Sequence, residues 1–263
     1  MKIRIALNGI LGKMGRSISA GLAADPDFEI CAGYDVSANS SILREGLKIG
    51  KVCVRLCGNT EGLFLCRPDV VIDFSNRSAF IELVKYATRD NVSLIVGTTG
   101  ISDEDMDYAR KLVNESGISV IVAPNFSIGA VLMMKFASFA SDYFKMCEII
   151  ELHHDHKIDA PSGTAVQTTG AIKNSLKRDH RLKENEFEKY EGARGAMVNG
   201  IHVHSVRLPG LMAHQEIIMG TQGQTLTIRH DTYDRSAYLP GVILAIRKLG
   251  DIKGLVCGLE NLI

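Results

Sequence analysis

Short apolar runs alternate with amphipathic segments through the first half of the chain. The apolar runs are typical of buried parallel strands, and the amphipathic segments carry apolar residues at helical spacing. The predicted strands cover residues 2–9, 28–35, 69–75, 93–100 and 118–125, and the predicted helices cover residues 16–24, 78–90 and 103–117. Strands that alternate with helices predict an α/β fold with a Rossmann-like, doubly wound parallel sheet.

The pattern changes after Asn125. Helices are predicted at residues 128–144 and 165–176, and the charged, glycine-interrupted segment 177–200 is typical of a surface loop. Long strands are predicted at residues 147–155, 202–210, 214–221 and 224–232. Because the last three strands follow one another without intervening helices, this half predicts a second, α+β domain with a mixed or antiparallel sheet.

The end of the chain returns to the pattern of its beginning. An apolar helix is predicted at residues 239–250, and a final apolar run follows at 254–263. A length of 263 residues fits two modest domains. We therefore predict one domain at residues 1–124 and 234–263 and a second at 125–233.

The composition excludes several classes of protein. Apolar residues make up 46% of the chain and charged residues 23%, as in ordinary globular proteins. The formal net charge is zero, so we expect no nucleic-acid partner. No stretch approaches the roughly 20 apolar residues of a membrane span, and the first residues carry no export signal. The six cysteines include no C-x-x-C pair. We therefore expect a soluble, cytoplasmic protein with no membrane partner, whose thiols are reduced and buried.

Residues 9–15, GILGKMG, follow the first predicted strand and open a helix. Glycines at this place let the backbone approach a pyrophosphate, whose charge is stabilised by the free N–H groups of the helix. Asp35 ends the second strand, where a carboxylate can accept hydrogen bonds from an adenosine ribose. An ordinary turn and a surface aspartate are the alternative. The motif and Asp35 together favour a dinucleotide site.

The residue after Asp35 bears on the choice of cofactor. Val36 stands where an arginine would bind a 2′-phosphate, and in the loop only Lys13 could meet that charge. The sequence therefore favours NADH over NADPH. Three further strand ends lie where ligands bind in such sheets, namely residues 73–75, 97–100 and 123–127.

All eight histidines lie between residues 153 and 230. This asymmetry suggests that the first domain holds a redox cofactor while the second performs acid–base chemistry. The segment ELHHDHKIDAPSGTA, residues 151–165, holds three histidines and Lys157. It ends in Ser162, Gly163 and Thr164 at the start of a predicted helix, where hydroxyls and free N–H groups suit a carboxylate. The segment predicts a site for a small acidic substrate that also needs a proton.

Other interpretations of these histidines stay open. His154 and His156 could share one face of a strand and bind zinc, although Lys157 is adjacent and no HExxH spacing is present. The histidines could also be ordinary hydrogen-bonded groups, an interpretation that has most weight for His156, His180 and His202. We favour the site without a metal.

GILGKMG, GTTG, APNFS and above all ELHHDHKIDAPSGTA resemble the dihydrodipicolinate reductase family, also called 4-hydroxy-tetrahydrodipicolinate reductase. The resemblance runs nearly end to end and includes the closing HDTYDRSAYLPGVILAIRKL. It implies an enzyme of lysine and diaminopimelate biosynthesis that reduces a small cyclic dicarboxylate with NADH or NADPH. It also implies a homotetramer, with a dinucleotide-binding first domain and a second domain for substrate binding and oligomerisation.

The resemblance assigns roles to matching positions. His153 would donate or accept a proton and Lys157 would be the catalytic proton donor, while His154, Gly163 and Thr164, together with Ser162, would bind substrate. The residues expected to contact the nucleotide are Gly9, Ile10, Leu11, Gly12, Lys13, Met14, Asp35, Gly97, Thr98, Thr99, Ala123, Pro124, Asn125 and Phe126.

The chain departs from the family pattern in two places. Pro124 stands where alanine is frequent, which removes a backbone N–H near the cofactor. The stretch 209–228 is looser than the usual G-x-x-x-x-H-x-V pattern, as Met212 and Ala213 show. Two rival functions are another two-domain NAD(P)-dependent dehydrogenase of a small carboxylate and a non-catalytic nucleotide sensor. A sensor would have no need of a proton donor beside an anion site.

Overall fold

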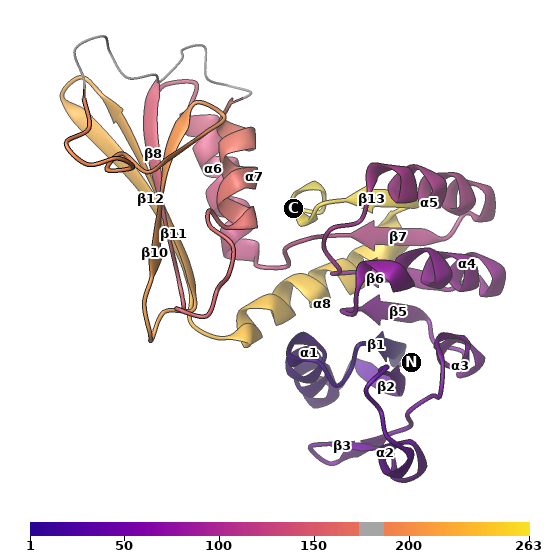
Figure 1. Ribbon diagram of the computed structural model, residues 1–263. Coiled ribbons are helices and arrows are strands. Elements are labelled where there is room, and N and C mark those ends of the chain that lie inside the picture. The colour runs from indigo at the N-terminus through magenta and orange to yellow at the C-terminus, as the bar shows by residue number, and fades with distance from the viewer. Residues whose placement is uncertain (174–186) are drawn as a thin grey trace. The chain divides into compact units, whose positions relative to one another are not determined.

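The computed structural model describes residues 1–173 and 187–263 (Figure 1). The chain forms two compact units. Unit 1 consists of Met1–Ile128 and Tyr238–Ile263, and unit 2 consists of Gly129–Ala237. Unit 2 is therefore inserted into the chain of unit 1.

Unit 1 is built on a six-stranded sheet in the order β13-β7-β6-β5-β1-β2, and all its strand pairs are parallel. The strands are β1 (Ile3–Asn8), β2 (Phe28–Tyr34), β5 (Val70–Asp73), β6 (Ser93–Val96), β7 (Ser119–Val122) and β13 (Gly254–Cys257). The predicted doubly wound sheet is confirmed. Strand β5 ends at Asp73 and β6 ends at Val96, so Phe74 and Ser75 and residues 97–100 form loops at the carboxyl edge.

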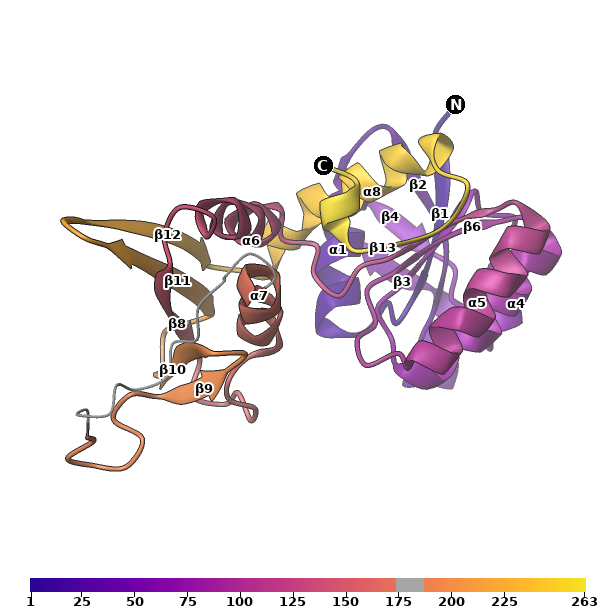
Figure 2. The same cartoon turned by 90° about the horizontal axis from the view of Figure 1, so that it is seen from above.

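Helices cover both faces of this sheet (Figures 1 and 2). One face carries α1 (Lys13–Ala24) and α8 (Leu239–Lys248), and the other carries α3 (Thr60–Leu65), α4 (Phe80–Asp90) and α5 (Asp103–Ser116). Because successive strand residues point to opposite faces, Ala6 and Val71 pack with Phe80 and Leu83 of α4. Helix α1 begins three residues before the predicted start, directly after Gly12.

The segment between β2 and β5 holds short elements that the apolar pattern did not predict. Helix α2 (Ser40–Glu45) and the hairpin of β3 (Leu47–Ile49) and β4 (Val52–Val54) precede α3. Asn39 caps α2 and Asn59 caps α3 through side-chain oxygens that accept backbone N–H groups. Elements this short hold too few residues to show a period.

Unit 2 contains a five-stranded sheet in the order β12-β11-β8-β10-β9. The strands are β8 (Met146–His153), β9 (Ala196–Val198), β10 (Ile201–Arg207), β11 (Ala213–Thr221) and β12 (Gln224–Thr232). Strands β8 and β10 are parallel and the other pairs are antiparallel, so the sheet is mixed. Helices α6 (Ile128–Ala140) and α7 (Gly163–Lys173) cover one face (Figures 1 and 2).

The core of unit 2 forms between this face and the helices, where Ile149, Val203 and Ile217 pack with Met133 and Ala137. The prediction of a surface loop at 177–200 is wrong for its last part, because β9 forms there and pairs with β10. Residues 174–186, which include His180, lie outside the described part of the chain. The remaining short elements are the 3-10 helices η1 (Arg77–Ala79), η2 (Arg235–Tyr238), η3 (Leu249–Asp251) and η4 (Leu259–Asn261).

The structure bears on two expectations from composition, which concern membrane-spanning helices and the burial of the cysteines. Within the described ranges, no helix is both long and apolar enough to cross a membrane. The six cysteines are free, and they differ in burial. Two are buried (Cys57 and Cys147), three are half-buried (Cys31, Cys66 and Cys257), and one is exposed (Cys53). The prediction that all six thiols are buried is therefore wrong for Cys53, which lies in the hairpin strand β4.

Candidate functional site

The glycines of the loop after β1 bring the backbone close to its neighbours. Gly9 has a φ of +78°, and a Cβ atom there would lie 2.6 Å from the carbonyl oxygen of Phe74. A Cβ atom on Gly15 would lie 2.1 Å from the carbonyl oxygen of Gly9. Gly12 is the N-cap of α1 and contributes no side chain to cap it. The start of α1 therefore presents backbone N–H groups and the positive end of the helix dipole, which suit a phosphate.

Asp35 follows β2 and faces this loop. Its carboxylate accepts hydrogen bonds from the backbone N–H of Leu11 at 2.9 Å and from the N–H and hydroxyl of Ser37 at 3.0 and 2.6 Å. Partial burial acts to raise the pKa of Asp35, but the hydrogen bonds from Ser37 and Leu11 outweigh it and hold that pKa below its ordinary value. Asp35 is therefore ionised near neutral pH and is an acceptor for ribose hydroxyls.

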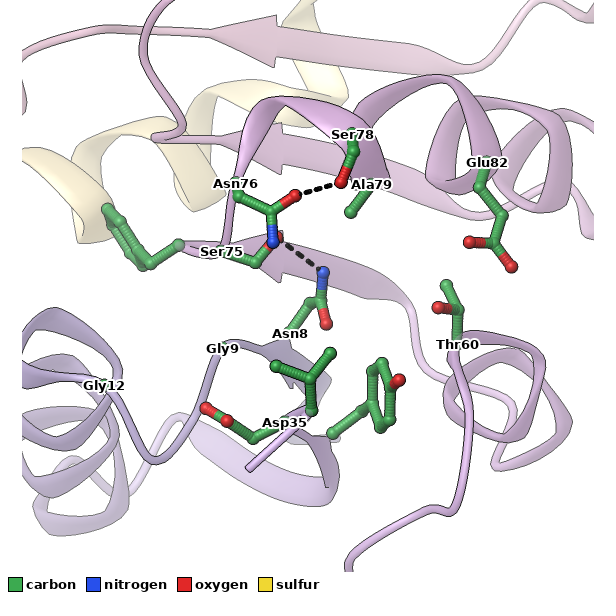
Figure 3. Close-up of a pocket in the computed structure, with 13 residues that line it drawn as sticks. Asn8, Gly9, Gly12, Asp35, Thr60, Ser75, Asn76, Ser78, Ala79 and Glu82 are labelled. Carbon is green, nitrogen blue, oxygen red and sulfur yellow. Dashed lines mark hydrogen bonds between the residues drawn. The ribbon is translucent and has the colours of Figure 1, made fainter. Parts of the chain in front are cut away.

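A pocket of about 350 Å³ opens beside Gly9, Gly12 and Asp35 (Figure 3). Glu82 and Ser78 line it from α4 and the turn before it, and Thr60 lines it from the start of α3. Its remaining wall is formed by Asn8, Tyr34, Val36, Phe74, Ser75, Asn76 and Ala79. The uncapped helix, the close glycine backbone and the ionised Asp35 together fit a dinucleotide. Thr60, Ser78 and Glu82 carried no signal in the sequence, because the fold alone brings α3 and α4 to this edge.

The buried carboxyl of Asp73 joins three strand ends. It accepts hydrogen bonds from Asn8 Nδ2 at 2.8 Å, Thr98 Oγ1 at 2.7 Å and Ser75 Oγ at 2.5 Å. Burial raises the pKa of Asp73 above its ordinary value, against the effect of these hydrogen bonds. The ends of β1, β5 and β6 therefore meet at one carboxyl group, which belongs to the strand end 73–75 expected to lie near the ligand.

The ring of Phe74 links the ends of these strands to the loop that follows β7. A Cβ atom on Gly97 would lie 2.2 Å from the Phe74 ring, so only glycine fits there. Phe74 also packs edge-on against Phe126, with 5.7 Å between ring centroids. Among the described residues, the predicted nucleotide positions after β6 and β7 lie outside the 350 Å³ pocket but at the same edge of the sheet.

The residues predicted to contact the nucleotide differ in their exposure and in the groups they present. Ile10 and Ala123 are fully buried, so their side chains belong to the core and do not face a ligand. Thr98 is buried and its hydroxyl donates to Asp73, whereas Thr99 and Pro124 are exposed. The remaining predicted positions are Lys13 and Met14 in the first turn of α1 and Asn125, whose Oδ1 accepts the backbone N–H of Ser127.

In unit 2, strand β8 ends in Glu151 and His153, which lie on the same face because strands have a period of two. The Glu151 side chain is fully buried, and its Oε2 lies 2.5 Å from His153 Nδ1. Arg207 of β10 donates to both carboxylate oxygens, at 2.9 and 2.7 Å. Burial acts to raise the pKa of Glu151, but the hydrogen bonds from His153 and Arg207 outweigh it and lower that pKa to about 2.

The turn after β8 holds Lys157. The backbone N–H of Lys157 donates to the carbonyl of His154 at 3.1 Å, and its ammonium donates to Asp159 Oδ1 at 2.7 Å. This hydrogen bond holds the pKa of Asp159 below its ordinary value. Arg207 in turn donates to the Asp159 carbonyl at 2.8 Å. Lys157 and His153 are therefore linked through Asp159, Arg207 and Glu151.

The start of α7 follows directly. Ser162 is buried, and its Oγ accepts the Ala165 N–H at 3.2 Å, so its hydroxyl oxygen caps the helix. The Ser162 N–H donates to Glu151 Oε1 at 3.3 Å. Gly163 is exposed, with open space where a Cβ would lie, and Thr164 is half-buried. Gly163 and Thr164 therefore form the accessible part of this helix start.

The structure does not support the zinc alternative. His156 lies in the turn after β8 with an 88% exposed side chain, so it does not share a strand face with His154. Within residues 1–173 and 187–263, no three His, Cys, Asp or Glu side chains are grouped to hold a metal ion.

Sequence reasoning missed Glu151, Asp159 and Arg207. A signal was present for Glu151, because it stands two residues before His153 on a predicted strand and so shares its face. Arg207 gave no such signal, since its contact depends on the parallel register that pairs it with His153.

A solved structure of similar fold covers the whole chain. It is described as dipicolinate-bound dihydrodipicolinate reductase from Paenisporosarcina sp. TG-14, with 42% sequence identity, a TM-score of 0.91 and full coverage of both chains. A probable dehydrogenase from Thermotoga maritima has a TM-score of 0.67 at 12% identity, covering 99% of this chain and 92% of its own. The second likeness concerns the fold alone.

Sequence comparisons agree over the full length. A 4-hydroxy-tetrahydrodipicolinate reductase from Desulfitobacterium hafniense is 43% identical over 262 residues, covering 99% of this chain and 98% of the relative. Another from Syntrophomonas wolfei is 43% identical over 265 residues, covering 100% and 99%. The model for the N-terminus of dihydrodipicolinate reductase matches residues 3–126, and that for its C-terminus matches residues 129–263. On these matches the chain belongs to the dihydrodipicolinate reductase family.

Proposed function

We propose that the protein is a 4-hydroxy-tetrahydrodipicolinate reductase, which uses NADH or NADPH to reduce this cyclic dicarboxylate to tetrahydrodipicolinate in lysine and diaminopimelate biosynthesis. The observation that carries the proposal is the linked group at the end of β8. One buried carboxylate there accepts hydrogen bonds from an imidazole, from the start of a helix and from Arg207, and Arg207 also donates to the segment that carries the Lys157 ammonium. Such a group suits a substrate that is anionic and must be protonated.

In this proposal unit 1 binds the nucleotide. The start of α1 accepts the pyrophosphate between Gly9 and Gly12, and Asp35 accepts hydrogen bonds from the adenosine ribose. The loops at 97–99 and 123–126 hold the other end of the nucleotide. The nicotinamide ring, when bound, would supply the hydride.

Unit 2 binds the substrate in this proposal. The accessible N–H groups at Gly163 and Thr164 bind a substrate carboxylate at the positive end of α7. The relative from Paenisporosarcina is described as bound to dipicolinate, a planar dicarboxylate, which supports a substrate of this class. Lys157 and His153 supply the proton that quenches negative charge as it develops on the ring, and His154 contacts the substrate.

We further propose that the enzyme is a cytoplasmic homotetramer assembled through unit 2, as the family resemblance implies. The six free cysteines support a reducing compartment. Light scattering coupled to size exclusion measures the assembly directly. A monomer at working concentration would contradict the tetramer without affecting the proposed reaction.

A coupled assay tests the reaction. A separate synthase condenses pyruvate with aspartate semialdehyde, and the loss of NADH or NADPH absorbance is followed after this protein is added. We expect oxidation that requires the synthase and the protein together. Absence of oxidation with either nucleotide, from folded protein that binds nucleotide, would contradict the proposal. In that case oxidation with another small carboxylate would indicate a different dehydrogenase, and binding without any turnover would indicate a sensor.

A further inference from the structure

The carboxylate of Glu151 is hydrogen bonded to three different parts of unit 2. His153 is on its own strand, Arg207 is on the neighbouring strand β10, and Ser162 directly precedes α7. No part of the Glu151 side chain is exposed. A buried carboxylate is costly unless it is paired, and Arg207 supplies the pairing charge with two parallel hydrogen bonds.

We propose that Glu151, held by Arg207, is a positioning residue that fixes the ring hydrogen of His153 on Nδ1 and leaves Nε2 as the atom that exchanges a proton with substrate. The catalytic part of this inference rests on the proposed function. The position of the hydrogen is a property of the folded protein and does not rest on it.

The chemistry of the contact fixes the direction of the hydrogen bond. An ionised carboxylate has no hydrogen to donate, so Glu151 can only accept. Arg207 is always charged and donates to both of its oxygens, which keeps the carboxylate ionised. The hydrogen between Nδ1 and Oε2 therefore belongs to His153. In a neutral imidazole the other nitrogen, Nε2, then carries the free electron pair that accepts a proton.

Glu151 and Arg207 also hold the segment that carries Lys157. The register of β8 with β10 sets Arg207 beside His153. From there the guanidinium reaches Glu151 with two N–H groups and the carbonyl of Asp159 with another contact. Asp159 accepts from the Lys157 ammonium. Glu151 and Arg207 thus hold both of the residues that handle protons in the proposed reaction.

The chain offers a matched control on the same strand. Glu148 contacts a histidine and an arginine as Glu151 does, with His204 Nε2 2.7 Å from its carboxylate and Arg194 as the other partner. The two glutamates are three positions apart, an odd number, so they lie on opposite faces of β8. Glu148→Gln therefore removes the same kind of contact without touching His153.

The first experiment is NMR of the full-length protein labelled with ¹⁵N-histidine, recorded at about pH 9, where imidazole is neutral. The His153 signals are assigned with His153→Gln. We expect the hydrogen of His153 on Nδ1 in the unmodified protein and in Glu148→Gln, and a shift of the population towards hydrogen on Nε2 in Glu151→Gln. Hydrogen on Nε2 in the unmodified protein would overturn the inference, and this measurement needs no variant that folds. An unchanged His153 signal in folded Glu151→Gln would overturn it as well.

Kinetics test the catalytic part. Loss of a positioned acid–base group lowers rates by roughly 10²- to 10⁴-fold, so kcat in Glu151→Gln should fall by about 10²-fold or more. The Kd for nucleotide and the kcat of Glu148→Gln should not change. A Glu151→Gln enzyme with unchanged kcat would overturn the positioning role. An unmodified protein that shows Nδ1–H but reduces no substrate would instead contradict the proposed function and leave the tautomer assignment intact.

Discussion

The hydroxyl of Thr98 donates a hydrogen bond to Oδ2 of Asp73 at 2.7 Å, and this bond ties the loop after β6 to the buried end of β5. Asn8, at the end of β1, donates to the other oxygen of the same carboxyl group. The carboxyl edge of the sheet, where ligands bind in folds of this class, is thus organised from inside the protein.

Replacement of Asp73 by alanine should loosen this edge. The amide of Asn8 and the hydroxyl of Thr98 would be left buried without their acceptor, and each such loss costs about 1–3 kcal/mol. We expect the free energy of unfolding in urea to fall by about 3 kcal/mol and the affinity for nucleotide to fall with it. Asp73→Asn keeps an acceptor and should lose less in both measurements. Unchanged unfolding and binding in Asp73→Ala would refute the role of this carboxyl.

Replacement of Asp35 by alanine should weaken the binding of NADH. Hydrogen bonds to a charged group are worth about 1.5–3 kcal/mol, so the Kd should rise about tenfold or more. The reason is that Asp35 supplies the acceptor for ribose and also holds the N–H of Leu11. Glu29→Ala, an exposed change on the same strand, is the control for titration by fluorescence. Equal NADH affinity in the two variants would contradict the assignment.

Replacement of Val36 by arginine should improve the binding of NADPH. Val36 is 80% exposed and lines the pocket beside Asp35, so a longer cationic side chain can occupy that space without displacing the core. One charged hydrogen bond to a 2′-phosphate should lower the Kd for NADPH by about tenfold. Calorimetric titration with both nucleotides measures the change, and the Kd for NADH serves as the internal reference. An unchanged ratio of the two Kd values would mean that Val36 does not adjoin the 2′ position.

Replacement of Lys157 by alanine should abolish most of the proposed reductase activity. A general acid contributes roughly 10²-fold or more to kcat. Because Lys157 belongs to unit 2, the Kd for nucleotide should be unaffected. Lys189→Ala, an exposed change in the same unit, controls for loss of positive charge. Full activity of Lys157→Ala in the coupled assay would remove Lys157 from the mechanism.

The stability of unit 2 should depend on pH through Glu151. Its pKa is lowered from 4.5 to about 2 in the folded protein, so the ionised form stabilises the fold. This stabilisation is present above pH 4.5 and is lost as the pH falls towards 2, and it corresponds to about 3 kcal/mol. Urea unfolding at a series of acidic pH values should show this loss in the unmodified protein and a flatter dependence in Glu151→Gln.

Asp73 provides a control of opposite sign for that experiment. Burial raises its pKa, so protonation of Asp73 in acid favours the folded state. Asp73→Asn removes this effect, and its unfolding free energy should fall more steeply with acid than that of the unmodified protein. Parallel curves for the unmodified protein, Glu151→Gln and Asp73→Asn would show that neither carboxyl sets the acid response.

The parts of the structure that could be predicted from the sequence are those fixed by local pattern. The strands of unit 1 are apolar on both faces, and in GILGKMG the positive φ of Gly9 and the close approach of Gly15 to the Gly9 carbonyl are local requirements for glycine. The helix start at Ser162 follows from capping chemistry. The segment between β2 and β5 could not be predicted, because its short helices and hairpin depend on contacts with the rest of unit 1 rather than on a period.

The contacts that complete the site depend on long-range register. Arg207 reaches Glu151 across 56 residues of sequence, and Thr98 reaches Asp73 across 25. No spacing rule links such residues before the strand order is known. The sequence therefore identified the residues expected to react, whereas the structure was needed to find those that hold them in place.

The order of the strands also bears on how the protein is made. The last strand of the sheet in unit 1, β13, pairs with β7, yet the whole of unit 2 lies between them in sequence. During synthesis the ribosome therefore releases β7 long before its partner exists. Until then the edge of β7 that β13 later covers is unpaired, and such an edge can pair with other chains. The sheet of unit 1 can therefore be completed only after unit 2 has been synthesised, when β13 pairs with β7 and takes its place at the edge of the sheet.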